Sequence, residues 1–168
     1  TGVEDDFSHL GESLFNHPFQ WGSKRTGPDL AREGGDLVEG SKDMRSGKRD
    51  NVWHYNHFMN PRQTSEGSNM PAYPWPFEQE TDLKALPKKI AVQQKLGVPY
   101  PTMDQHDILD RAQVQAREIA DSLAAAQVLQ PGELDMEQEE FAQHLAKQKV
   151  VALIAYMQKL GTYRIVEK

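Results

Sequence analysis

The sequence contains no cysteine among its 168 residues. A chain without thiols forms no disulfide, performs no thiolate catalysis and offers no cysteine ligand to zinc. It also lacks the two thiols through which a CxxCH motif attaches a haem covalently. Because cysteine is missing altogether, its usage does not indicate whether the protein works in an oxidising or a reducing compartment.

Long apolar runs and an excess of basic residues are missing as well. No segment approaches the ~20 apolar residues that cross a bilayer, and the N-terminal TGVEDDF has neither the basic start nor the apolar stretch of a signal peptide. The 25 acidic and 19 basic residues give a net charge of −6, which disfavours nucleic-acid binding. We expect a single domain over residues 1–168, with any membrane anchor outside them.

The patterns that the sequence does contain are helical. Apolar residues recur at helical spacing, between capping or breaking residues, in the segments 50–59, 82–96, 104–128 and 138–160. Residues 1–50 are rich in glycine and charge and predict loops with short helical turns. Patterns typical of strands are weak throughout, so the sequence predicts an all-α fold with long loops.

Individual residues refine these helices. Asp50 is placed to cap the first helix, while Pro87 either kinks or divides the second and Gly97 ends it. The segment 104–128 predicts a long amphipathic helix laid on the outside of the domain. The segment 138–160 has the widest apolar stripe, so we expect one continuous helix there that is the most buried element.

The stretch SNMPAYPWP, residues 68–76, places Met70 in a loop whose three prolines rule out a helix. One interpretation is that Met70 fills a gap under a surface loop, as flexible methionines often do. The other is that the prolines stiffen the loop so that the sulfur is presented as a metal ligand. The stretch alone leaves both open.

His54 and His57 stand three residues apart on the first helix, a spacing that lets two imidazoles face one metal. A zinc hydrolase built on them would need a third ligand and a general base, and neither has a recognisable spacing here. A structural or surface role for both histidines is therefore the favoured interpretation.

Three short motifs resemble parts of class I cytochromes c. They are GPDLA (27–31), NMPAY (69–73) and the terminal VALIAYMQKLG (151–161). In that family a GP-x-L turn offers its proline carbonyl to the proximal haem histidine, an M-P-A-[FY] loop provides the distal methionine, and a C-terminal helix packs over the haem edge. The three motifs occur here in the same order.

Longer stretches resemble the mono-haem cytochrome c subunit, subunit II, of cbb(3)-type cytochrome c oxidases. They are GESLFNHPFQWGSKRTGPDLAREGG (11–35), WHYNHFMNPR (53–62) and SNMPAYPWPFE (68–78). The resemblance implies a class I cytochrome c-like domain with a helical insertion at about 98–140. It also implies an N-terminal membrane anchor and a CxxCH motif upstream of Thr1, so this chain is expected to be a fragment truncated at its N-terminus that lacks both.

The resemblance also implies the site residues. Met70 would be the axial ligand of the haem iron, and the turn around Pro28 and Leu30 would face the proximal histidine. Four aromatic side chains would form the wall of the haem pocket; they are Trp21, Tyr73, Trp75 and Tyr156. The complete protein would carry haem c, whereas this cysteine-free fragment is expected to carry none.

The implied function is electron transfer without bond chemistry. The subunit would take electrons from a di-haem cytochrome subunit or a soluble cytochrome c and pass them to the catalytic subunit. It would lie at the periplasmic face of the bacterial inner membrane, reach the membrane only through the missing helix, and bind no nucleic acid. The alternative is a non-redox interaction module of a membrane complex, docked through the insertion.

Overall fold

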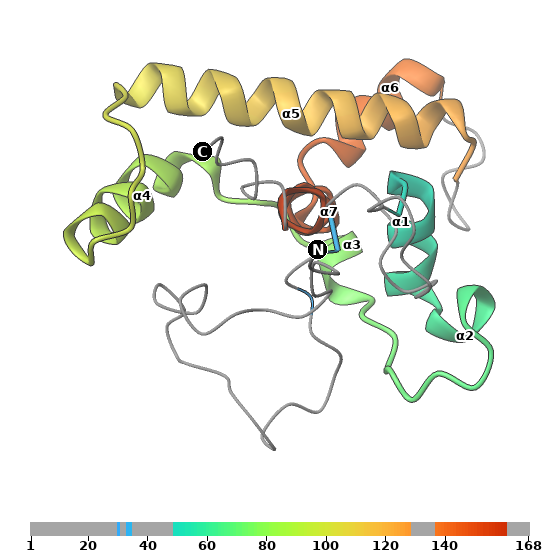
Figure 1. Ribbon diagram of the computed structural model, residues 1–168. Helices are drawn as coiled ribbons and strands as arrows, with labels where there is room; N and C mark the ends of the chain where they lie inside the picture. The colour runs from blue at the N-terminus through green and yellow to red at the C-terminus, as the bar shows by residue number, and fades with distance from the viewer. Residues whose placement is uncertain (1–29, 31–32, 35–48, 129–136, 161–168) are drawn as a thin grey trace, which may run out of the picture.

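The computed structural model describes residues 30, 33–34, 49–128 and 137–160, and these form an all-α arrangement (Figure 1). Its helices are α1 (Asn51–Met59), α2 (Pro61–Thr64), α3 (Trp75–Glu78), the 3-10 helix η3 (Leu83–Ala85), α4 (Leu86–Lys95), α5 (Gln105–Ala125), α6 (Gln138–Leu145) and α7 (Lys149–Lys159). Within the described ranges the only β-type pairing is an isolated antiparallel bridge between Glu80 and Gln148. The predicted all-α class is confirmed.

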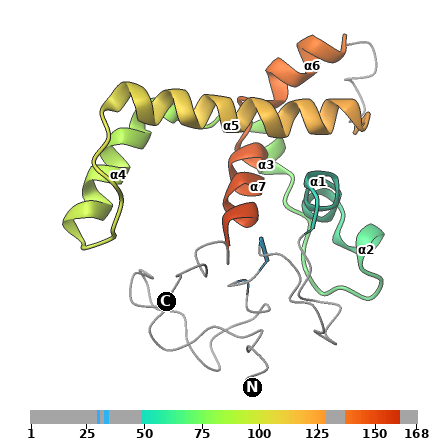
Figure 2. The same cartoon turned by 45° about the horizontal axis from the view of Figure 1, so that its top comes forward.

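The long helix α5 crosses one side of the domain, with α7 and α1 beneath it (Figures 1 and 2). The Asp104 carboxylate accepts a hydrogen bond from the backbone N–H of Asp107 at 2.8 Å, which caps its first turn. The C-terminal half of α5 contributes Ile119, Ala120, Leu123 and Ala124 to the core. The predicted amphipathic helix therefore exists, and one of its ends is a structural part of the core.

The core itself is centred on α7 and draws side chains from several helices. The completely buried members include Tyr55, Phe141, Leu123, Leu145 and Ile154. They come from α1, α6, α5 and α7, so these four helices are held by one apolar cluster. Burial of such large side chains is the main contribution to the stability of the arrangement.

The prediction of one continuous helix over residues 138–160 is wrong. The structure divides the segment into α6 and α7, with a break at 146–148. At the break the Lys147 carbonyl accepts from the N–H of Thr81 at 2.7 Å, and the N–H of Lys149 donates to the Gln79 carbonyl at 2.8 Å. This long-range pairing replaces helical hydrogen bonds, and no proline or glycine marks it in the sequence.

The local signals for α1 and α4 are confirmed, whereas the prediction that prolines rule out a helix over 68–76 is wrong at its end, because Trp75 and Pro76 begin α3 and the first helical turn accepts proline. The Asp50 carboxylate accepts from the N–H of Trp53 at 2.6 Å and caps α1. Pro87 divides the second segment, because it lies in the first turn of α4 directly after η3. Gly97 has φ 90° and closes α4: its N–H donates to the Gln94 carbonyl, and that of Val98 donates to the Gln93 carbonyl.

No helix within the described ranges is long and apolar enough to span a membrane.

Candidate functional site

The Met70 loop connects α2 to α3, and contacts with α1 hold its α3 end. At its end near α3, the N–H of Tyr73 donates to the Phe58 carbonyl at 2.9 Å, which ties the loop to α1. Phe77 of α3 is buried and makes an edge contact with the ring of Tyr55, at 4.9 Å between centroids. Two buried aromatic residues of α1, Tyr55 and Phe58, therefore hold the segment that follows Met70.

Met70 itself is half-buried and packs against the core cluster. Its backbone N–H donates to the Ser68 hydroxyl at 3.2 Å, a local turn that orients the residue. The side chain therefore neither fills the centre of the core nor extends freely into solvent. A thioether in this position packs against the core and remains partly accessible, as a metal ligand must.

Tyr73 and Trp75 follow Met70 closely in the sequence, and their side chains contact each other. Their rings form an edge-to-face pair with centroids 5.1 Å apart. Tyr73 is half-buried against the core, whereas Trp75 keeps 49% of its surface exposed. Among the described residues no ring contact joins either of them to Tyr156, which lies on α7 and is 61% exposed.

Leu30 belongs to a turn that meets the C-terminal end of α7. The N–H of Glu33 donates to the Leu30 carbonyl at 3.1 Å, and the N–H of Gly34 donates to the Leu160 carbonyl at 2.8 Å. Leu30 itself is 41% exposed. The structure thus places the turn of Leu30, Glu33 and Gly34 at the C-terminal end of α7. Pro28 and Trp21 lie outside the described residues.

The start of α1 lies at the same junction. The Gln158 side-chain amide donates to the carbonyl of Arg49 at 2.7 Å and to the Asn51 side-chain oxygen at 3.2 Å. Burial raises the pKa of the Glu33 carboxyl, and the positive charge of Arg49 partly opposes that rise. Three segments far apart in the sequence are therefore joined around the last turn of α7.

The two histidines of α1 have different environments. His54 is only 1% exposed, and neither of its ring nitrogens has a hydrogen-bond partner within the described part of the chain. Burial, together with repulsion from His57, lowers its pKa to about 4. At neutral pH it is an uncharged ring that stacks on Phe58, with centroids 6.1 Å apart.

His57 is half-buried and stacks on the indole of Trp53, with centroids 4.3 Å apart. Its Nδ1 contacts the Thr64 hydroxyl, which is also 3.2 Å from the Pro61 carbonyl. If the hydroxyl donates to that carbonyl, Nδ1–H must be the donor toward Thr64. Across the described ranges no group of three His, Cys, Asp or Glu residues could hold a metal ion, so nothing found there supports the zinc-hydrolase alternative.

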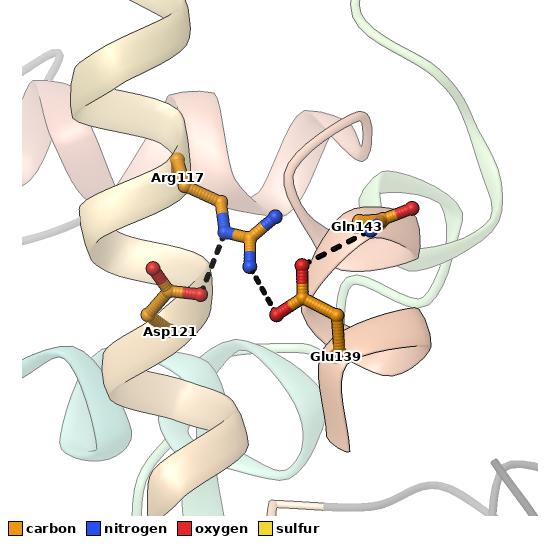
Figure 3. A network of polar contacts seen from close by, with 4 residues as sticks. All are labelled: Arg117, Asp121, Glu139 and Gln143. Atoms are coloured by element: carbon orange, nitrogen blue, oxygen red, sulfur yellow. Dashed lines mark hydrogen bonds and ion pairs between the residues drawn. The ribbon is translucent and has the colours of Figure 1, made fainter. Parts of the chain in front are cut away.

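An open groove of about 680 Å³ lies away from the Met70 loop, between η3, α5 and the α6–α7 break. A polar network borders it, centred on Arg117 of α5 (Figure 3). Arg117 donates to Glu139 at 2.6 Å and to Asp121 at 2.7 Å, and Gln143 donates to Glu139 at 3.1 Å. The bond from Arg117 lowers the pKa of the Glu139 carboxyl. This network links α6 to α5 and gives Arg117 and Gln143, which line the groove, a structural role.

A family model matches the chain over residues 5–164, and it describes the cytochrome c oxidase mono-heme subunit, FixO. The chain belongs to this family. No curated protein matches the chain at a significant level. As a FixO-family chain it is a subunit type of cytochrome c oxidase, a membrane-associated enzyme, and its partners are other subunits of that oxidase.

Sequence reasoning identified the Met70 loop and the Leu30 turn but gave no role to Gly34. A signal was present in the sequence, because the pair GG at 34–35 comes only three residues after the end of GPDLA. An added Cβ at Gly34 would collide with the carbonyl groups of Met157 and Gln158, so only glycine lets the turn approach α7 this closely.

Proposed function

We propose that this FixO-family chain is the haem domain of an electron-transfer subunit of a cbb(3)-type oxidase. It receives electrons from a di-haem cytochrome subunit or a soluble cytochrome c donor and passes them to the catalytic subunit at the periplasmic face of the membrane. The observation that carries this proposal is the placement of Met70: a half-buried thioether on a loop tied to α1 by the bond between Tyr73 and Phe58.

Met70 could bind one side of a haem, but none of the residues in this sequence could attach the haem covalently. Met70 supplies a soft ligand of the kind that haem iron accepts in cytochromes c. The 168 residues contain no cysteine, so the thioether bonds of a c-type haem have to come from residues outside this sequence. When bound, the haem supplies a reversible one-electron couple.

The protein's own residues then set the environment of that couple. The Met70 thioether would bind the iron and raise its reduction potential. The edge-to-face pair of Tyr73 and Trp75, and Tyr156 on α7, would exclude water from the haem edge, because their rings are large and apolar and those of Trp75 and Tyr156 are exposed. Pro28 would offer its carbonyl to the proximal histidine, and Trp21 would complete the wall.

The test uses the complete natural subunit with its haem attached. Met70→Ala should leave the haem covalently bound but change its absorption spectrum and lower its midpoint potential, because the sixth ligand is lost. Met59→Ala is the matched control, since Met59 also packs, partly buried, against the core. It should destabilise the fold without altering the potential. Pro71→Ala should have an intermediate effect by loosening the loop.

Two results would contradict the proposal. In the first, Met70→Ala leaves the haem spectrum and the midpoint potential unchanged. Met59→Ala, or the same substitution at Met103, changes both, which would place the ligand at another methionine. In the second, the natural subunit shows no haem bands, which would favour the interaction-module alternative. The 168-residue chain alone should show the bare polypeptide mass under denaturing conditions, since it has no thiol.

A further inference from the structure

The segment 83–103, here called the α4 arm, differs in charge from the rest of the chain. It carries four lysines, Lys84, Lys88, Lys89 and Lys95, and no acidic residue or arginine, although the whole chain has a net charge of −6. All four lysines are exposed. An isolated cationic segment on an acidic protein attracts anionic surfaces that the remainder of the protein repels.

The arm also exposes apolar side chains. Val92 is 48% exposed, Leu96 53% and Tyr100 46%, and α4 has no buried residue. Val92 lies one helical turn from Lys88, Lys89, Lys95 and Leu96, so the apolar side chains and the ammonium groups share one surface of the helix. This surface combines apolar contact with positive charge.

The arm is an ordered projection. Both views show α4 at the end of α5 that lies farthest from α6, away from α7 and α1 (Figures 1 and 2). After α4 the chain folds back, because the Gln94 amide donates to the carbonyls of Tyr100 and Pro101 at 3.2 and 3.3 Å. Tyr100 is therefore held beside the helix, and the projecting surface is preformed.

We propose that the α4 arm binds the surface of an anionic lipid bilayer, with Val92, Leu96 and Tyr100 entering the headgroup region and the lysines contacting lipid phosphates. Lysine favours this partner over a protein, because it is depleted in protein–protein interfaces, where arginine and aromatic residues are enriched. At a bilayer its long stem covers apolar surface while the ammonium group stays hydrated. Tyrosine is enriched at the same depth.

This binding is independent of electron transfer. It would hold the α4 end of the domain against the membrane and so limit the orientations that the domain adopts there. Only the lysines of the α4 arm attract the anionic bilayer, and the net charge of −6 on the whole chain repels it. Binding should therefore be weak and strongly dependent on ionic strength.

The experiment uses the 168-residue chain with vesicles of phosphatidylcholine alone and of an equimolar mixture with phosphatidylglycerol. Sedimentation at low ionic strength should show binding to the mixture only. Lys88→Glu combined with Lys89→Glu should lower the partition coefficient by more than about tenfold, because each charge is reversed near the surface. Arg62→Glu combined with Arg111→Glu is the matched control: it changes the net charge equally from exposed positions on α2 and α5 and should have a much smaller effect.

A site-specific probe tests the orientation. Because the chain has no cysteine, Leu96→Cys carries a single environment-sensitive fluorophore, and Arg62→Cys carries the same label as a control. The label at 96 should shift to the blue on anionic vesicles, and the label at 62 should not. Circular dichroism establishes that each variant is folded.

Several results would overturn the proposal. They are the absence of binding to anionic vesicles, equal loss of binding in the two charge-reversed pairs, and a label at 96 that responds to isolated oxidase subunits but to no vesicle. The last result would assign the arm to a protein interface. None of them bears on Met70, so failure here leaves the proposed function standing.

Discussion

The backbone N–H of Gly34 donates to the carbonyl of Leu160 at 2.8 Å, so a turn near the start of the chain closes the last turn of α7. The contact depends on the missing side chain of Gly34, because a Cβ there would overlap the Met157 and Gln158 carbonyl groups. We expect Gly34→Ala to lower the free energy of unfolding by about 1–3 kcal/mol, the range for overpacking a close contact. Urea denaturation measures this.

Gly67 provides the control for that substitution. It has φ 77°, but a Cβ added there would meet no other atom of the described residues within 4 Å, so its constraint is conformational only. Asparagine tolerates positive φ, and Gly67→Asn should be nearly neutral while Gly34→Asn is at least as destabilising as Gly34→Ala. Equal effects at the two positions would show that the approach of Gly34 to α7 is not the cause.

The centre of α7 should be the most sensitive part of the core. Ile154 is 0% exposed, and Ile154→Ala should cost about 2–5 kcal/mol by leaving a cavity. Val114→Ala on α5 removes apolar atoms from a residue that is 58% exposed and should stay within about 0.5 kcal/mol of the parent. A small effect at Ile154, measured by chemical denaturation, would move α7 out of the core.

These predictions separate what the sequence could reveal from what it could not. Asp50, Pro87 and Gly97 act within one helical turn, so their capping and breaking roles followed from local chemistry. The break at 146–148 depends on hydrogen bonds to residues about seventy positions earlier, and no local pattern encodes it.

In the candidate site, too, some features follow from the local sequence and others depend on tertiary contacts. The prolines around Met70 predicted a loop over 68–76, and this is right only as far as Pro74, because Trp75 and Pro76 form the first turn of α3, where proline is tolerated. Its attachment to α1 through Tyr73 and Phe58 is a tertiary contact that spacing does not reveal. His54 likewise gave no sequence signal of its burial, because its position on α1 becomes an interior one only when the other helices pack against it.

Acid should destabilise the protein through His54. Its pKa is about 4 in the fold against an ordinary value of 6.5, so between these values the unfolded chain binds a proton that the folded chain does not. Above about pH 6.5 this group does not affect the free energy of unfolding. As the pH drops toward 4 the free energy of unfolding falls, by about 3 kcal/mol in total. Thermal or urea unfolding across this range measures the loss.

The matched variants for this prediction are His54→Leu and His106→Gln. The first removes the titrating ring, so the decline between pH 6.5 and 4 should become shallower, whatever the change in stability at neutral pH. The second alters a histidine whose side chain is 84% exposed and should retain the parent's decline because His54 is intact. A decline that is identical in all three proteins would assign the acid sensitivity to other groups.

Proline at the start of α7 should be harmful, although the first position of a helix normally accepts it. Lys149 occupies that position, but its N–H donates to the Gln79 carbonyl at 2.8 Å and so holds α7 against the stretch that follows α3. Lys149→Pro removes this donor and should cost at least about 0.5–1.5 kcal/mol. Lys149→Ala keeps the N–H while removing the side-chain bond to Gln79 and should cost less.

Proline at the first position of α6 is the control for Lys149→Pro. Gln138→Pro places the same ring after Glu137, whose φ of −62° and ψ of 144° already suit a residue before proline. Gln148 has similar angles before Lys149, so the backbone strain of the two substitutions is matched. Gln138→Pro should therefore be neutral or slightly stabilising, because it restricts the unfolded chain. If both proline variants unfold at the same urea concentration as the parent, the bond between Lys149 and Gln79 does not hold the break between α6 and α7 in place.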